Sequence, residues 1–128
     1  MDASVIVALS VREADWEHHA ARMDEEPIRY SSAISPWESV AETRLRLGVS
    51  AARARMIIDR VADTNGFTRV PIGPEEAQAA LTAFERYGKG AGHRAPLNMG
   101  DCFAYACAMT NGARLLYKGD DFSHTDLA

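Results

Sequence analysis

Short β-type runs alternate with long helical segments along this sequence, and this order limits the possible folds more than any other feature. Residues 28–33, 67–72 and 114–117 have the composition of short strands, and a fourth run, which ends at Asp2, is cut short because only Met1 precedes it. Helical segments separate these runs, as in parallel sheets whose strands are joined by right-handed crossovers. The order predicts an α/β fold in which a small parallel sheet of about four strands is flanked by helices.

Start and stop residues mark the helical segments. Ser35 and Pro36 form a typical helix start, and Gly48 is a natural stop. Ser50 starts a helix again, and Ser4 is placed to cap the first turn of the chain. The predicted helices cover residues 14–24, 35–47, 50–64, 74–87 and 101–110.

Length and composition indicate one globular domain over residues 1–128. Hydrophobic residues make up 47% of the chain and the formal net charge is −4, which argues against a surface that is basic all over. No run approaches the roughly 18 consecutive apolar residues of a membrane-spanning helix, so we expect no membrane role. Cys102 and Cys107 have a spacing unlike that of common zinc pairs. We interpret them as buried, reduced thiols, which fits a cytoplasmic protein.

Carboxylates stand where the predicted strands end. Asp2 follows the first strand, and Asp120 and Asp121 follow the last. Asp101 begins the helix before that last strand, and Glu38 lies in the first turn of the helix after the second. Functional sites of parallel sheets lie at the carboxyl ends of the strands, so we expect these acids to meet. Gathered carboxylates repel one another unless a cation neutralises them, and their oxygens suit Mg²⁺ or Mn²⁺.

Each of these acids also has a simpler explanation. Asp101 and Glu38 would cap helices or complement a helix dipole, and residues 120–121 would form a turn after Gly119. Helix caps have no reason to gather at one edge of a sheet, however. We therefore favour the metal site for the set as a whole.

Four motifs resemble those of the PIN-domain ribonucleases, and closely those of VapC-type toxins of bacterial toxin–antitoxin pairs. The motifs are Asp2-Ala3-Ser4, Ser32-Ala33 through Glu38, Leu97-Asn98-Met99-Gly100-Asp101-Cys102-Phe103-Ala104-Tyr105-Ala106, and the segment from Leu115 to Asp126. The resemblance implies a metal-dependent endoribonuclease with Mg²⁺ or Mn²⁺ as cofactor. Its catalytic set matches Asp2, Glu38, Asp101 and Asp120, with Asp2, Asp101 and Asp120 as the metal ligands.

The same resemblance supplies further candidates and partners. Asp121 is placed to share or replace the role of Asp120, and Asp126 is a candidate support outside the ligand set. Ser4 would position a metal-bound water or cap a turn. The implied partners are an RNA substrate, a cognate antitoxin that blocks the site, and a second copy of the chain in a homodimer.

The start of the chain departs from the family pattern. PIN domains place a few apolar residues before the first Asp as a central strand, whereas only Met1 stands there. We expect translation to start a few codons upstream of Met1. The alternative is an unusually short strand whose amino group lies beside the metal site and weakens metal binding.

Basic residues offer contacts for RNA phosphates. Lys89, His93 and Arg94 lie in the glycine-rich loop over residues 88–96, which leads into Asp101, and Lys118 precedes the last acidic pair. The alternative for each is a solvated side chain in an ordinary ion pair.

Two other functions share parts of this pattern. A receiver-type signalling domain also gathers acids and Mg²⁺ at one sheet edge, and Asp2 and Lys118 fit it, but no Asp ends the run over residues 67–72 to accept a phosphoryl group. A catalytically inactive PIN-fold binding partner would keep only the fold. The presence of all four acids argues against that alternative.

Overall fold

The structure is a computed structural model that describes all 128 residues. Its elements, in chain order, are α1 (Ala3–Val11), α2 (Trp16–Asp24), β1 (Arg29–Ser32), α3 (Ile34–Leu47), α4 (Ala51–Thr64), β2 (Phe67–Val70), α5 (Pro74–Tyr87) and α6 (Met99–Thr110). All five predicted helices are present, and their ends differ from the predicted ones by no more than the usual ambiguity of helix boundaries.

β1 and β2 form a parallel two-stranded sheet, in which Arg29 is opposite Phe67 and Ser32 is opposite Val70. The connection between them runs through α3 and α4. The prediction of an α/β fold with parallel strands and helical crossovers is therefore confirmed. The prediction of about four strands is wrong, because the sheet has two.

Residues 114–117 stay outside the sheet because no strand of sufficient length lies beside them. The N–H of Asp2 donates to the carbonyl oxygen of Leu116 at 3.0 Å, and the amino group of Met1 donates to the carbonyl oxygen of Tyr30 at 2.8 Å. Two residues are too few to continue a ladder on either side. The start of the chain thus bridges β1 and residues 114–117 without joining them into one sheet.

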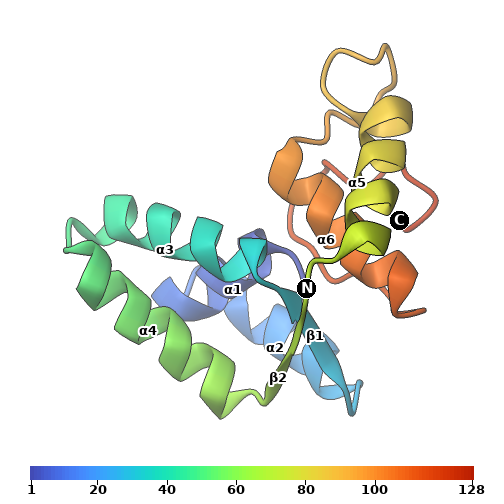
Figure 1. Ribbon diagram of the computed structural model, residues 1–128. Coiled ribbons are helices and arrows are strands. Elements are labelled where there is room, and N and C mark those ends of the chain that lie inside the picture. Colours follow the sequence, from blue (N-terminus) through green and yellow to red (C-terminus); the bar gives the residue numbers. More distant parts are fainter.

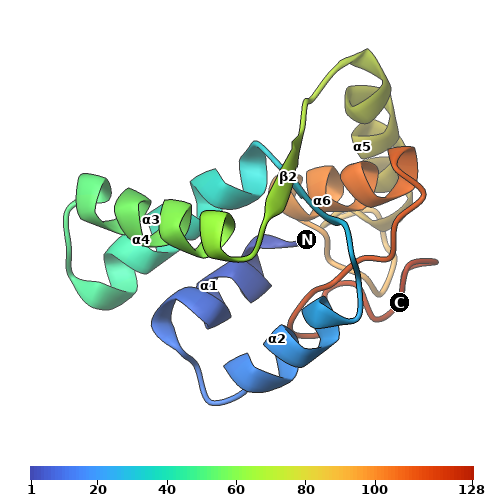
Figure 2. The ribbon, with the colours of Figure 1, turned by 90° about the horizontal axis from the view of Figure 1, so that it is seen from below.

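The strands cross between two groups of helices. α3 and α4 pack together on one side of the strands, and α5 and α6 pack together on the other (Figure 1). The largest hydrophobic cluster involves α5, α6 and the C-terminal segment and includes Leu97, Tyr105 and Phe122. Figure 2 shows the N-terminus at the centre of the molecule, between the two groups of helices. Side chains from both groups can therefore meet around the start of the chain.

α1 is enclosed by protein rather than lying on the surface. Residues 5–8 are consecutive and all buried, whereas an amphipathic helix would bury one face only. The helix packs against α2, α3 and α4. Its N-cap is Asp2 and not Ser4 as predicted, because the Asp2 carboxylate accepts a hydrogen bond from the N–H of Ser4 at 2.9 Å. A buried helix thus fixes the position of Asp2.

Cys102 and Cys107 are free, buried thiols, as predicted. Burial raises the pKa of the Cys102 thiol to about 11, so this thiol stays protonated at neutral pH. None of the helices is both long enough and apolar enough to cross a membrane.

Candidate active site

Three helix starts bring the first three predicted acids together. Asp2 caps α1, Glu38 lies near the start of α3, and Asp101 lies in the first turn of α6. Asp2 and Asp101 are buried, with 5% and 7% of their surface exposed, and Glu38 is half-buried. Helix starts carry unpaired N–H groups and the positive end of the helix dipole, which favours carboxylates there.

The Asp2 carboxylate is held in place by Ser4. The carboxylate accepts hydrogen bonds from both the N–H and the hydroxyl of Ser4. The Ser4 hydroxyl oxygen in turn accepts from the N–H of Lys118 at 3.0 Å. Ser4 therefore links the first carboxylate to the backbone just before the last acidic pair.

Asp101 forms a reciprocal helix cap with Asn98. The N–H of Asp101 donates to Asn98 Oδ1 at 3.1 Å, and the N–H of Asn98 donates to Asp101 Oδ2 at 2.7 Å. The simpler explanation, a helix cap, is thus correct for Asp101, but it occupies only one carboxylate oxygen. A capping role and a metal-ligand role are compatible in this residue.

The charges around Asp101 are unusual for a cap. Burial, together with the negative charges of Asp2, Asp121 and Glu38, raises the pKa of the Asp101 carboxyl to about 7, against the opposing hydrogen bond from Asn98. Burial, and then the charge of Asp2, also raises the pKa of Glu38. Asp2, Glu38 and Asp121 therefore lie close enough to act on Asp101, and Asp2 lies close enough to act on Glu38.

Asp120 and Asp121, the last acidic pair, differ in their surroundings. Asp120 and Asp121 are both exposed, but only Asp121 contributes to the raised pKa of Asp101. The carbonyl oxygen of Asp120 instead accepts hydrogen bonds from Ser123 within a turn. The structure therefore brings Asp121, rather than Asp120, toward the other acids.

No positive side chain neutralises this group of acids. Asp2, Glu38, Asp101, Asp120 and Asp121 take part in none of the ion pairs of the structure. Lys118, which we predicted to contact RNA phosphates, pairs with Glu13 and Asp15 instead.

The carboxylate oxygens of these acids are suitable ligands for a hard divalent cation, although the side chains do not converge on one metal position. The atoms available are carboxylate oxygens, which Mg²⁺ and Mn²⁺ prefer. As the side chains stand, no three His, Cys, Asp or Glu residues are positioned to hold one metal ion. Mutual repulsion favours such a spread arrangement. A cation would reduce the repulsion and let the carboxylates approach one another.

Comparison with known proteins identifies the fold family. The family model of the PIN domain matches residues 1–127. The chain belongs to the PIN domain family. A VapC ribonuclease of Rhizobium meliloti is 39% identical over 138 aligned residues, which cover 99% of this chain and 97% of that protein. Ribonuclease VapC30 of Mycobacterium tuberculosis is 38% identical over 128 residues, which cover 100% of this chain and 95% of that protein. Ribonuclease VapC of Mycolicibacterium smegmatis is 37% identical over 128 residues, which cover 100% of this chain and 96% of that protein.

The glycine-rich loop of this PIN domain is clamped at its base. The N–H of Lys89 donates to the carbonyl oxygen of Leu97 at 2.9 Å, and the N–H of Leu97 donates to that of Tyr87 at 3.0 Å. The loop therefore starts and ends close to the start of α6.

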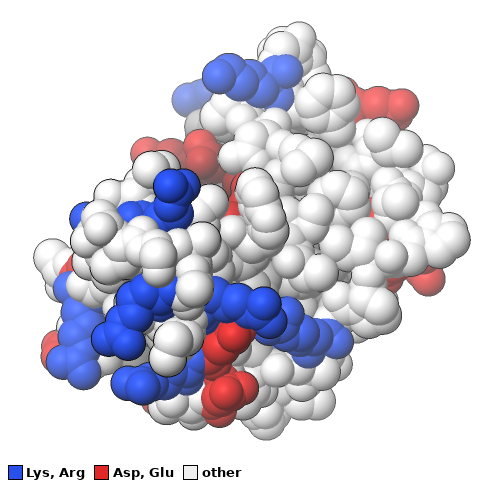
Figure 3. Space-filling view, turned by 60° about the vertical axis from the view of Figure 1, so that its left-hand side comes forward, with Lys and Arg blue, Asp and Glu red and all other residues white.

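Lys89 and Arg94 are exposed and form no ion pair, so their charges are free to meet phosphates. His93 is exposed, but its Nδ1 accepts from the N–H of Ala95 at 3.1 Å and its ring packs on Tyr87. Figure 3 shows Lys and Arg side chains gathered over the side of α3 and α4 and a second group at the top of the view, with acidic side chains between them. Basic side chains thus lie on both sides of acidic ones on this face of the molecule.

Asp126 lies apart from the other acids of the PIN domain. Its carboxylate accepts a hydrogen bond from the Tyr105 hydroxyl at 2.8 Å and lies 3.3 Å from Nη1 of Arg86. These contacts join the C-terminal tail to α5 and α6. The structure shows no contact between Asp126 and the acids around Asp101.

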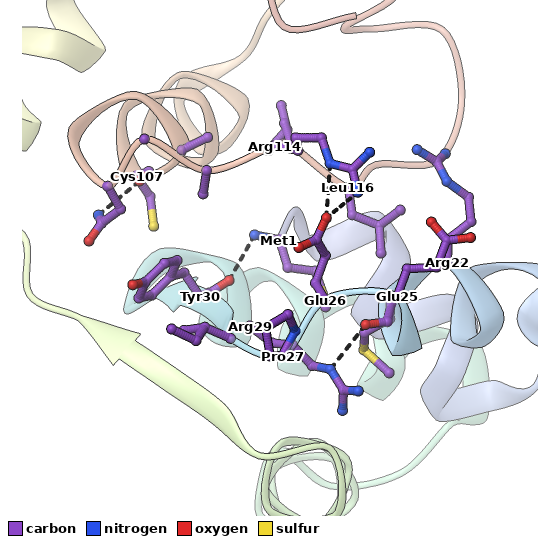
Figure 4. Close-up of a pocket in the computed structure, with 17 residues that line it drawn as sticks. Met1, Arg22, Glu25, Glu26, Pro27, Arg29, Tyr30, Cys107, Arg114 and Leu116 are labelled. Atoms are coloured by element: carbon purple, nitrogen blue, oxygen red, sulfur yellow. Dashed lines mark hydrogen bonds and ion pairs between the residues drawn. The ribbon is translucent and has the colours of Figure 1, made fainter.

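A separate cavity of about 340 Å³ lies between β1 and residues 113–116 (Figure 4). Met1, Tyr30 and Cys107 are among the residues that line it, and none of the predicted catalytic acids does. The Met1 amino group points toward Tyr30 at its edge (Figure 4). Burial lowers the pKa of this amino group, so burial of its charge is unfavourable. The charge of Asp2 opposes this lowering of the pKa, so the amino group lies near the first carboxylate, although none of the predicted catalytic acids lines the cavity.

Sequence reasoning missed one residue of the site. Gly100 stands beside Asp101 and in contact range of Glu38, but we gave it no role. A glycine in the first turn of a helix is a weak signal, since glycine is also common at caps.

Proposed function

We propose that this PIN domain is a metal-dependent endoribonuclease that acts as the toxin of a toxin–antitoxin pair. The observation that carries the proposal is the group of carboxylates around Asp101, which comes from three helix starts and the C-terminal segment and has no basic partner. The VapC ribonuclease names of the similar proteins support the same activity.

Asp2 and Asp101 would hold Mg²⁺ or Mn²⁺, together with one member of the last acidic pair. The position of Asp121 near Asp101 favours it over Asp120, which remains the alternative. When bound, such a cation supplies an activated water and stabilises the charge that develops on the phosphate.

The side chains of the protein would have separate roles in cleavage. The Glu38 carboxylate accepts a hydrogen bond from the attacking water and orients it, because Glu38 is half-buried beside Asp2 and Asp101. Lys89 and Arg94 bind phosphates next to the scissile bond and so fix the RNA. Water would attack the phosphorus, the P–O bond to one of the two riboses would break, and the departing ribose oxygen would take up a proton released by the water, so no covalent bond forms between RNA and protein.

Partners and location follow from the same proposal. A cognate antitoxin would cover the acidic site, and two copies of the chain would pair as a homodimer. A cytoplasmic location, where RNA is available, fits the two free thiols. These three statements rest on the family resemblance and are open to test by purification of the chain with its antitoxin.

The decisive experiment is cleavage of total RNA by the purified chain with Mg²⁺, with Mn²⁺ and with a chelator. We expect discrete RNA fragments with either metal and intact RNA with the chelator. The Asp101→Asn variant, measured beside it, excludes a contaminating ribonuclease. Metal binding without cleavage of any RNA would instead support the inactive PIN-fold binding partner, and absence of both would overturn the metal site.

A further inference from the structure

Gly100 lies directly before Asp101 in the first turn of α6 and is buried. A Cβ atom added to Gly100 would lie 2.0 Å from Oε2, 2.1 Å from Oε1 and 2.2 Å from Cδ of Glu38. Non-bonded carbon atoms in proteins are at best separated by about 3.5–4.0 Å. The carboxylate of Glu38 therefore occupies the place in which any other residue would put its side chain.

The three nearly equal distances show how the Glu38 carboxylate is oriented relative to Gly100. Both oxygens and the carbon between them are close to the absent Cβ, so the group as a whole lies over the backbone of Gly100. Glu38 belongs to α3 and Gly100 to α6, and these helices are in contact. The start of α6 also attracts a carboxylate through its dipole. This contact is how the Glu38 carboxylate reaches the acids on the other helix.

The usual reasons for a glycine do not apply at this position. Gly100 is not among the glycines with positive φ, so its backbone conformation is open to other residues. Within a helix, glycine is less favourable than alanine because it loses more conformational freedom on folding. The three atoms nearest to an added Cβ all belong to the Glu38 carboxylate, so the space taken by Glu38 requires a residue without a side chain.

We propose that Gly100 is a positioning residue for the cleavage reaction: the absence of its Cβ keeps open the place from which the Glu38 carboxylate acts beside Asp2 and Asp101. The proposal rests on the proposed function, because it assigns a role within the same site. Glu38 is the long, movable partner in this contact. A methyl group on Gly100 would therefore displace the carboxylate and leave the helix in place.

The test is the Gly100→Ala variant, with Gly73→Ala as the matched control. Gly73 also precedes a helix turn beside a glutamate, but its added Cβ would lie 3.3 Å from Oε2 of Glu76, away from the acidic site. We expect Gly100→Ala to melt at the same temperature as the parent or higher. Its Mn²⁺ affinity and RNA cleavage should fall by about 10–100-fold, the loss typical when a hydrogen-bonding side chain beside the metal ligands is moved out of place. Gly73→Ala should keep both.

A double variant separates displacement of Glu38 from general damage. Glu38→Asp withdraws the carboxylate by one methylene group, so alone it should weaken Mn²⁺ binding and cleavage. In the Gly100→Ala background the carboxylate is already displaced, and Glu38→Asp should cost little more. Multiplicative losses in the double variant would overturn the proposal, because they would show that the two residues act independently.

A crystal structure of Gly100→Ala gives a readout that does not depend on activity. We expect the Glu38 carboxylate to have left the position over residue 100, with α6 unchanged. An unmoved carboxylate, or unchanged Mn²⁺ affinity, would overturn the role of Gly100. Absence of RNA cleavage in the parent would instead contradict the proposed function, and the carboxylate position and Mn²⁺ affinity would still decide the role of Gly100.

Discussion

The N–H of Asp2 donates a 3.0 Å hydrogen bond to the carbonyl oxygen of Leu116, and this contact joins the two ends of the acidic site. Asp2 is the first carboxylate along the chain, and residues 120–121 follow Leu116 by a few positions. The hydroxyl of Ser4 accepts from the N–H of Lys118 and repeats the link. Backbone contacts, rather than charge pairs, therefore hold mutually repelling carboxylates near one another.

Asp101→Asn is expected to abolish RNA cleavage while the fold persists. The amide oxygen can still accept from the N–H of Asn98, so the cap of α6 is kept, but the charge that attracts a cation is lost. Mutation of a residue that supports a metal ligand typically lowers activity by about 10–100-fold, and loss of a ligand itself should lower it more. Cleavage of a labelled RNA and thermal melting of the same preparation test this. Full activity of the variant would contradict the assignment of Asp101.

The metal-free protein is expected to lose stability as pH rises from about 4 to about 7. The pKa of Asp101 is about 7 in the folded chain against an ordinary 3.8, so the folded state binds more protons than the unfolded state in this window. More protons on the folded state means that the free energy of unfolding falls as pH rises. Melting temperatures across this range in a chelator measure the effect. Asp101→Asn, which cannot titrate, should show a smaller decrease.

Mn²⁺ should reverse this dependence. A cation competes with the proton on Asp101, so Mn²⁺ affinity is expected to rise by up to about tenfold per pH unit below the pKa and to level off above it. Calorimetric titrations at pH 5.5, 6.5 and 7.5, values chosen about one unit apart around this pKa, give the trend. Affinity independent of pH would argue that Asp101 is not a ligand.

Asp121→Asn is expected to weaken Mn²⁺ binding about tenfold or more, and Asp120→Asn much less. The two residues are adjacent, exposed and chemically identical, which makes each the control for the other. Of the two, only Asp121 contributes its charge to the raised pKa of Asp101. Calorimetric titration of both variants decides between them. A larger loss in Asp120→Asn would restore our original choice of ligand.

The helices were predictable because their signals are local. Ser50 accepts from the N–H of Arg53, and Gly48 takes the left-handed conformation that ends α3, as their positions in the sequence indicate. The strands were less predictable, because a strand exists only beside a partner. Residues 114–117 have a suitable composition, but the one backbone hydrogen bond that they form with another segment comes from Asp2. The number of strands thus depends on a contact between distant segments.

The site was predictable in type but not in detail. The acids at predicted strand ends and helix starts indicated a cation site, and the structure brings Asp2, Glu38 and Asp101 together. The partner of Lys118 depends on Glu13 and Asp15, which are more than a hundred positions away, so its sequence neighbours could not reveal it. Adjacent residues in a turn point in different directions, which left the choice between Asp120 and Asp121 open.

Lys89→Ala and Arg94→Ala are each expected to weaken RNA binding in a salt-dependent way. Both side chains are exposed without an ion pair on the loop that leads to Asp101. Removal of one phosphate contact should lower the slope of log affinity against log salt by about 1. Binding is measured in the Asp101→Asn background to prevent cleavage. Arg114→Ala, which removes an exposed arginine that pairs with Glu26, is the control and should leave the slope unchanged.

Apolar residues added ahead of Asp2 are expected to stabilise the protein by filling the cavity beside β1. The cavity measures about 340 Å³, and its two walls are bridged by the hydrogen bonds from Met1 to Tyr30 and from Asp2 to Leu116 and, at the exposed side, by the ion pair of Arg114 with Glu26. An added Val-Ile pair between Met1 and Asp2 would continue these contacts as a strand and move the buried amino group outward. One fully buried aliphatic side chain contributes about 1.5–3 kcal/mol.

A gain of that size corresponds to a melting temperature higher by about 4 °C or more in a domain near this length. The control is a Gly-Ser pair at the same position, which lengthens the chain equally but buries little apolar surface. The Val-Ile variant should also protect the amides of residues 28–30 and 114–116 from hydrogen exchange, because a strand between them would use their backbone groups. Equal melting temperatures for the two insertions would show that the cavity does not receive a strand.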